Sequence, residues 1–162
     1  MGTTDNFDTP NHAGPVTAAD TVPVISSSTG RGATARVDQV LRGGYGTPGS
    51  DATAGNITLT AAQVLAGLFV RDPNGASRTD VLPTAALLVA AMTRPAVGDV
   101  IRLLVVNGAD AAETITFTAG SGGSYDANQT AASRLIGQNA SKLMHIRLTN
   151  VTASSEAYVV YL

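Results

Sequence analysis

The stretch KLMHIRLT at residues 142–149 alternates between two kinds of side chain, and it decides the fold class. One set is apolar throughout and the other is mixed: Met144, Ile146 and Leu148 against Leu143, His145, Arg147 and Thr149. Successive side chains of a β-strand point to opposite faces, so a period of two predicts a strand with one face in a core.

Similar runs surround this stretch on both sides. Residues 100–106 are apolar except for Arg102, which predicts a strand buried on both faces. Residues 113–118 alternate with Ile115 and Phe117 inward. Further short strands are expected at 57–60, 68–71, 77–82, 133–136 and 157–162.

Turns and short helices separate these runs. Thr60 and Gln63 have the spacing of a capping box, which predicts a helical turn ending near Gly67. Pro83-Thr84 opens a helix over residues 85–92. A tight turn is expected at DPNG, residues 72–75, and a glycine/serine loop at residues 120–126. The pattern predicts an all-β fold with one or two short helices, arranged as a β-sandwich or barrel.

The first part of the chain has a different composition. Residues 1–54 are rich in proline, glycine and serine, and their apolar patches are brief. They carry too little apolar surface for a core of their own, which indicates an extended arm or an irregular set of strands. We therefore expect an N-terminal arm at 1–54 and a β-sandwich domain at 55–162.

Composition limits the classes of function. The formal net charge is −2, which provides no steering field for nucleic acid or acidic membranes, and there is no cysteine. Only 14% of the 162 residues are charged, against about 25% in ordinary soluble domains. We expect some surface to be covered by oligomerisation or by docking on a larger body. A monomer with a threonine-rich β surface is the alternative.

No targeting or membrane-spanning signal is expected. Residues 1–11 lack a basic region followed by an apolar one, and the longest apolar stretch, 81–92, is interrupted by Pro83 and Thr84. We expect a soluble protein that is assembled in a cytoplasm.

Chemically active residue patterns are also missing from the sequence. His12 and His145 have no nearby carboxylate pattern, so no metal site is expected, and no cofactor motif occurs. The two glutamates, Glu113 and Glu156, flank strands and are expected to be exposed at an edge or turn. No motif of a nucleophile with its base is present, so a non-enzymatic protein is expected.

The span 57–162 resembles the head decoration (cement) proteins of tailed bacteriophages. The resemblance rests on turn and strand signatures: ITLTAA at 57–62, RDPNG at 71–75, TDVLPTA at 79–85, VGD at 97–99, residues 107–114, AG at 119–120, TNVT at 149–152 and YVVY at 158–161. It implies a jelly-roll-like β domain, commonly a trimer, on the outer surface of a capsid assembled in the bacterial cytoplasm. It also implies the major capsid protein and further copies of this chain as partners. The net charge and the lack of a long apolar stretch lead us to expect no nucleic-acid or membrane partner.

Three arginines of the arm are candidate capsid contacts. Arg31, Arg36 and Arg42 could pair with carboxylates of the shell, beside a short apolar patch at Val37, Val40 and Leu41. Solvated arm charges are the alternative interpretation.

Two other classes of function compete with a decoration protein. A fibre, spike or receptor-binding module could use the same scaffold to hold glycans, but the chain is only 4% aromatic, and Tyr45 and Tyr125 are its only loop tyrosines. A small hydrolase lacks any supporting motif.

Overall fold

The computed structural model describes residues 21–25, 32–36 and 47–162. Two capped helices form at the positions that the sequence predicts. The Thr60 hydroxyl accepts a hydrogen bond from the Gln63 amide (3.2 Å), and the Gln63 side chain accepts one from the Thr60 amide (2.8 Å). This capping box begins α2 (Ala61–Leu65), and Gly67 follows with φ +80°. The Thr84 side chain caps α3 (Ala85–Ala91) in the same way, by accepting from the Leu87 amide.

The other regular elements of the described residues are short strands and one 3-10 turn. The strands are β1 (Thr21–Ile25), β2 (Gly32–Arg36), β3 (Gly49–Asp51), β4 (Leu68–Arg71), β5 (Arg78–Val81), β6 (Val100–Asn107), β7 (Ile115–Thr118), β8 (Gly123–Tyr125), β9 (Leu135–Ile136), β10 (Ser141–Asn150) and β11 (Ala157–Tyr161), and a 3-10 turn, η1 (Ala132–Arg134), precedes β9. The alternating burial of β7 and β10 confirms the inward sets predicted for both.

The chain divides into two units, 1–44 and 45–162. In the first unit, β1 and β2 pair antiparallel. The second unit contains all the other elements named above. It includes β3, which lies within the range expected as arm and pairs with β4.

The second unit contains two sheets. The larger has the strand order β3-β4-β6-β10-β11-β8, and the smaller has the order β5-β7-β9. The fold is thus mostly β with two short helices. A jelly roll is not confirmed, because jelly rolls are antiparallel, whereas four strand pairs here are parallel: β3 with β4, β4 with β6, β5 with β7, and β11 with β8.

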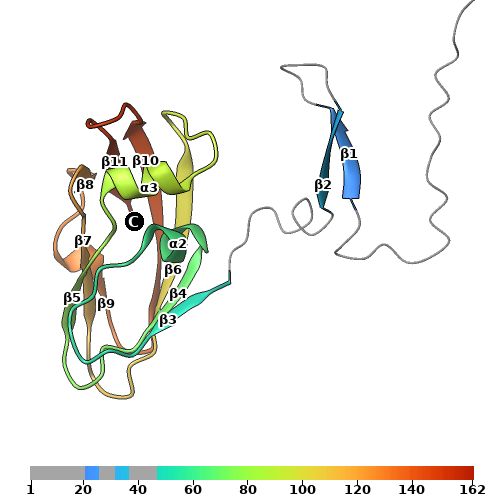
Figure 1. Ribbon diagram of the computed structural model, residues 1–162. Helices are drawn as coiled ribbons and strands as arrows, with labels where there is room; N and C mark the ends of the chain where they lie inside the picture. Colours follow the sequence, from blue (N-terminus) through green and yellow to red (C-terminus); the bar gives the residue numbers. More distant parts are fainter. Residues whose placement is uncertain (1–20, 26–31, 37–46) are drawn as a thin grey trace, which may run out of the picture. The chain divides into compact units, whose positions relative to one another are not determined.

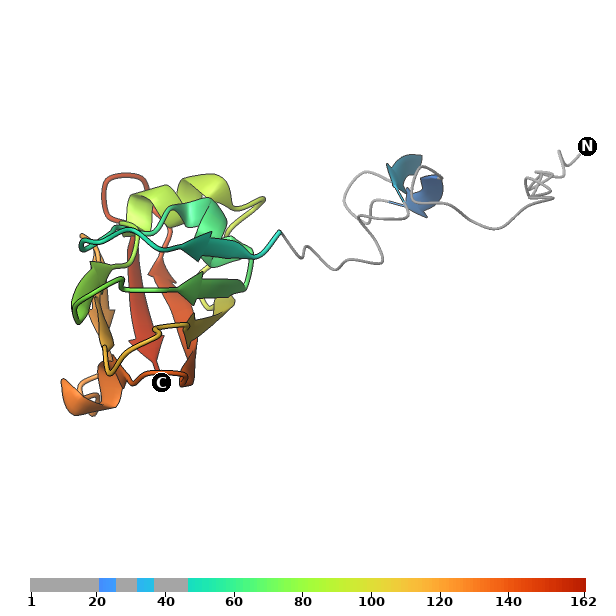
Figure 2. The same cartoon turned by 90° about the horizontal axis from the view of Figure 1, so that it is seen from below.

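The core lies between the two sheets (Figures 1 and 2). Phe69, Leu103 and Met144 of the larger sheet contribute to it, as do Ile115 and Phe117 of the smaller one. Helix α2 packs on β4 and β6, and α3 packs near β11, so both helices add to the same inner side. No element of residues 47–162 covers the opposite face of the larger sheet, which we call the outer face.

The prediction that β6 is buried on both faces is wrong. Its burial alternates: Ile101, Leu103 and Val105 are buried, whereas Val100 is 51% exposed and Arg102 is exposed. The strand occupies the middle of the sheet, but only its inner side chains reach the core. An apolar sequence therefore covers a face that is open to solvent.

Other local predictions also need correction. Residues 57–60 form only an isolated bridge, Thr58 with Val81, rather than a strand. Part of the expected glycine/serine loop is strand β8, and the expected strand at 133–136 begins with η1. Glu113, expected to be exposed, is 6% exposed.

Among the residues that the structure describes, no helix has the length and apolar character needed to cross a membrane.

Candidate interaction surface

Cross-strand register places the side chains of the outer face in four rows. Each row runs across neighbouring strands and joins residues that are direct partners in the sheet. The rows are Ser50-Val70-Val106-Ser141, Leu68-Leu104-Leu143, Arg102-His145-Tyr161 and Val100-Arg147-Val159-Ser124. These fourteen residues define the outer face.

The first two rows are largely apolar, and we call their five apolar members, Leu68, Val70, Leu104, Val106 and Leu143, the apolar half. Val70 is 38% exposed and Leu143 is 42% exposed. Scattered exposed apolar residues are normal, but a contiguous patch of them is typical of an interaction site.

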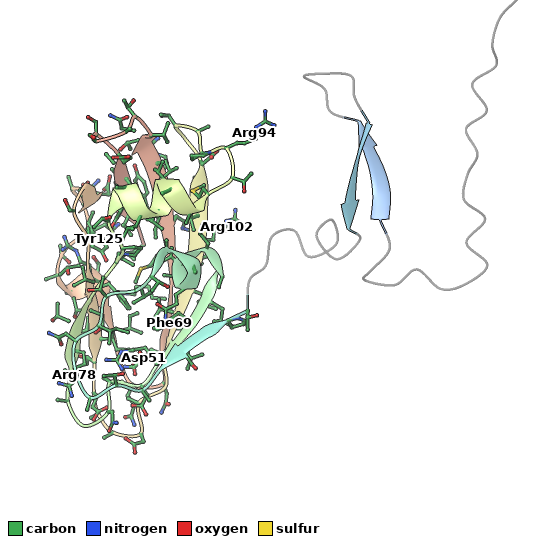
Figure 3. All side chains as sticks on the ribbon, in the orientation of Figure 1. Asp51, Phe69, Arg78, Arg94, Arg102 and Tyr125 are labelled. Carbon is green, nitrogen blue, oxygen red and sulfur yellow. The ribbon has the colours of Figure 1, made fainter. Side chains whose placement is uncertain are left out.

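The other two rows carry the positive charge, and we call Arg102, His145, Arg147 and Tyr161 the basic half. Arg102 and His145 are direct cross-strand partners, and His145 is the partner of Tyr161 on its other side. The Arg147 guanidinium carbon lies 5.9 Å from the centre of the Tyr161 ring. Figure 3 shows Arg102 projecting away from the core, whereas Phe69 of the neighbouring strand lies within it.

No carboxylate belongs to the outer face as defined here. Asp51 of β3 is the cross-strand partner of Arg71, and its side chain lies 3.4 Å from the Arg71 guanidinium on the inner side. Within residues 47–162, ion pairs form only at Arg71, so neither Arg102 nor Arg147 is neutralised there.

The outer face shares part of the composition of protein–protein interfaces. Such interfaces are enriched in arginine and tyrosine and depleted of lysine, aspartate, glutamate and serine. The face contains arginine and tyrosine and lacks lysine and carboxylates, but it also contains three serines, and its apolar side chains lie on one half of it. Four rows two residues apart span about 20 Å, and six strands span about 24 Å. The face therefore offers an area on the order of 500 Å², less than the roughly 800 Å² that each partner buries in a standard interface.

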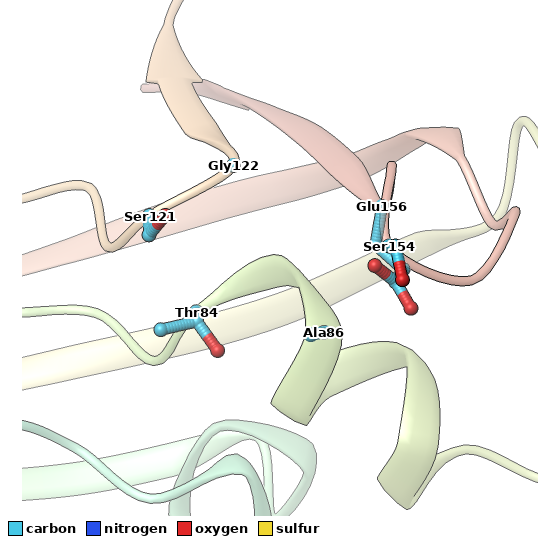
Figure 4. Close-up of a pocket in the computed structure, with 6 residues that line it drawn as sticks. All are labelled: Thr84, Ala86, Ser121, Gly122, Ser154 and Glu156. Carbon is cyan, nitrogen blue, oxygen red and sulfur yellow. The ribbon is translucent and has the colours of Figure 1, made fainter.

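An open pocket of about 380 Å³ lies elsewhere, near the start of α3 (Figure 4). Its lining is Thr84, Ala86, Ser121, Gly122, Ser154 and Glu156. None of these six is a histidine, a lysine or an aromatic residue. They provide hydroxyls and one carboxylate, but no ring on which a sugar could stack.

Two tyrosines, the partly buried Tyr125 and the buried Tyr158, have shifted pKa values. Burial raises the pKa of Tyr125, and the charge of Arg134 partly opposes this increase. Burial also raises the pKa of Tyr158, and a hydrogen bond from the Gly120 amide partly opposes it. Both hydroxyls donate to backbone carbonyls, of Phe117 and Pro83 respectively, so both residues have structural roles.

Other chemical groups are isolated. No three His, Cys, Asp or Glu side chains group as metal ligands within the described ranges 21–25, 32–36 and 47–162. Glu113 Oε2 is buried and has no hydrogen-bond partner in that part of the chain. A single buried carboxylate without a neighbouring base or nucleophile does not make a catalytic site.

Most of the predicted arm contacts lie outside the described residues: Arg31, Val37, Val40, Leu41 and Arg42. Arg36 ends β2, where its backbone pairs with Thr21. Of the two loop tyrosines considered for glycan binding, Tyr45 is not described. Tyr125 belongs to β8, and its ring lies 4.2 Å from the guanidinium carbon of Arg134.

The sequence contained a signal for the outer face that was interpreted differently. The apolar run of β6 predicts a strand buried on both faces, and the alternation of β10 gives one side of mixed character. Placed side by side by the register, Leu104 and Leu143 extend one apolar surface, and Arg102 and His145 extend one polar surface. Only the pairing of the strands reveals it.

Comparisons with protein-family models, with curated proteins and with solved structures found no match.

Proposed function

We propose that this protein is a non-enzymatic structural component of a virion, a decoration protein that docks on the outer capsid shell of a tailed bacteriophage. The outer face carries this proposal, because it is an apolar and basic surface on a chain in which only 14% of the residues are charged. The sequence resemblance to head decoration proteins supports the same class. That family has a jelly-roll-like β domain, and we propose a distant relationship to it.

The small size of the outer face favours docking as an oligomer. One copy offers an area on the order of 500 Å² by strand geometry. Several linked copies can dock together and gain avidity without any new kind of contact. We propose a homotrimer, as the resemblance implies, with the major capsid protein as its partner.

Docking would stabilise the shell by mass action. A ligand that binds only the assembled state stabilises that state by an amount that grows with its concentration relative to its dissociation constant. A decoration protein that bridges capsid subunits would thus oppose expansion or disassembly of the shell. No chemical step is required of the protein.

Co-sedimentation with purified capsids tests this function. The full-length chain should pellet with capsids at a saturating ratio and should raise the temperature at which the capsids disassemble. Bovine serum albumin provides the control for trapped protein. If the full-length chain stays in the supernatant and leaves the disassembly temperature unchanged, the decoration function is wrong. Binding to a glycan array instead would favour the fibre or receptor-binding alternative.

A further inference from the structure

The arginines in the basic half of the outer face have no carboxylate partner in the described part of the chain. Arg102 and Arg147 are diagonal neighbours on adjacent strands, because Arg102 pairs with His145, two residues before Arg147. The two arginines carry like charges within reach of each other, and no carboxylate among the fourteen residues of the face neutralises either of them. A partner that provides carboxylates would remove the repulsion and gain charge-assisted hydrogen bonds.

A second copy of the same face is a poor partner. Two outer faces related by a two-fold axis would bring the basic half of each against the apolar half of the other, or the two basic halves together. The first arrangement buries Arg102 and Arg147 without counter-charges, and the second opposes like charges. Burying an unpaired charge is costly, so charge complementarity argues against this symmetric pairing.

A phosphate-rich partner also fits poorly. Nucleic-acid binding draws most of its affinity from many phosphate contacts, whereas this face has two arginines and one histidine. The five side chains of the apolar half would then face a highly charged, hydrated backbone. A protein surface with both carboxylates and apolar side chains satisfies both halves at once.

We propose that the outer face docks on a protein surface that presents carboxylates beside an apolar strip. Arg102 and Arg147 pair with the carboxylates, and Leu104 and Leu143 cover the strip. This inference rests on the proposed function in one respect: the surface belongs to the capsid shell. Docking on the shell should then weaken as salt concentration rises, because part of the attraction is between exposed charges.

Charge-reversed variants of the full-length chain test the basic half. Arg102→Glu and Arg147→Glu should each weaken capsid binding at least tenfold and should reduce its dependence on NaCl concentration. Arg94→Glu is the matched control: it makes the same change of net charge at an exposed loop position outside the face and should alter binding less than twofold. Equal losses for all three variants would overturn the proposal, since only net charge would then matter.

A second matched pair tests the apolar half. Leu143→Ser should weaken capsid binding about fivefold, whereas Leu87→Ser, at a 56% exposed position of α3, should leave it unchanged. Circular dichroism and thermal unfolding of each variant identify any that is misfolded. If Leu143→Ser and both arginine variants all bind like the wild type, the outer face is not the docking surface.

A capsid-free experiment separates failure of the inference from failure of the function. The full-length chain is titrated with an acetylated Asp-Leu-Asp-Leu-Asp peptide, and amide shifts are followed by NMR. Shifts confined to the outer face, absent with a Lys-Leu-Lys-Leu-Lys peptide, are expected even if no capsid binds. Unshifted outer-face amides at millimolar peptide would overturn the inference, as would larger shifts with a DNA oligonucleotide. Sedimentation equilibrium showing self-association that Arg147→Glu abolishes would assign the face to a second copy instead.

Discussion

The buried side chain of Arg71 binds residues 51–55, near the start of the second unit, to the inner side of the larger sheet. Its side chain is fully buried, and its Nε donates to Asp80 Oδ2 at 2.9 Å. The other guanidinium nitrogens donate to backbone carbonyls of the entering segment, including that of Thr53 at 3.1 Å and that of Gly55 at 2.6 Å. A planar guanidinium with five donors suits this arrangement, because one side chain satisfies carbonyls that lie in several directions.

Removing the partner of this buried charge should be costly. Asp80→Asn leaves Arg71 without its counter-charge and weakens the acceptor of the Ile57 amide, so we expect the free energy of unfolding to fall by about 3–5 kcal/mol. Arg71→Lys keeps the charge but loses the planar fork, and should cause a smaller loss. Arg94→Lys, at an exposed position, should stay within about 0.5 kcal/mol of the wild type. Urea unfolding followed by circular dichroism measures all three. A shift for Asp80→Asn no larger than that of the control would show that the ion pair does not stabilise the fold.

Tyr125 and Tyr158 make the stability of the fold depend on alkaline pH. Their pKa values are raised in the folded state, whereas an unfolded tyrosine titrates at about 10. The unfolded state therefore loses these protons first as the pH rises. The stabilising effect is complete below about pH 10 and is lost as the pH rises from there toward the folded-state pKa values. Ionisation of Tyr158 would also remove its hydrogen bond to the Pro83 carbonyl.

Urea midpoints measured from pH 8 to pH 11.5 should therefore fall steeply above about pH 10. The double variant Tyr125→Phe, Tyr158→Phe should start from a lower midpoint, because two hydrogen bonds are lost, and should show a shallower fall. Parallel pH profiles of the two proteins would contradict the assignment of this dependence to the two tyrosines.

At the scale of elements, local patterns predicted strands and caps well. The period of two in β10 identified its buried side, Met144, Ile146 and Leu148, and the capping box at Thr60 identified the start of α2. Both features depend only on residues a few positions apart. They are therefore visible without knowledge of the strand pairing.

Features that depend on distant partners were missed. Gly123 was assigned to a loop because its neighbours are glycine and serine, yet it pairs with Tyr158 in a parallel ladder. A Cβ at Gly123 would lie 2.1 Å from the Tyr158 ring, so the glycine is needed for this close approach. Four parallel pairs likewise join segments that no hairpin signal connects.

The misjudged burial of β6 has a functional interpretation. An apolar run predicts burial, but it does not distinguish burial in the chain's own core from burial against another molecule. Val100 and Leu104 belong to that run and lie on the outer face. The position where the sequence prediction failed is thus also the position where the proposed docking surface lies.

At the scale of the whole molecule, the two faces of the larger sheet have different roles in the second unit: one maintains the fold and the other is available for docking. Its inner face joins the smaller sheet and both helices in the core, which maintains the fold. Its outer face makes no such contact within residues 47–162 and is available to a partner. Substitutions on the outer face can therefore change docking while the core stays intact, which is why the matched variants proposed above are informative.

The position at which the second unit begins can be tested by shortening the chain. The sequence alone favoured a boundary before Gly55, but β3 and two carbonyl acceptors of Arg71, those of Asp51 and Thr53, precede that residue. A chain starting at Gly55 leaves part of a buried guanidinium without acceptors, so its free energy of unfolding should be about 1–3 kcal/mol lower than that of a chain starting at Tyr45. Thr53→Ala in the longer chain keeps the carbonyl and should have little effect. Urea unfolding of the three proteins decides the matter: equal midpoints for both starting positions would show that residues 45–54 do not stabilise the domain.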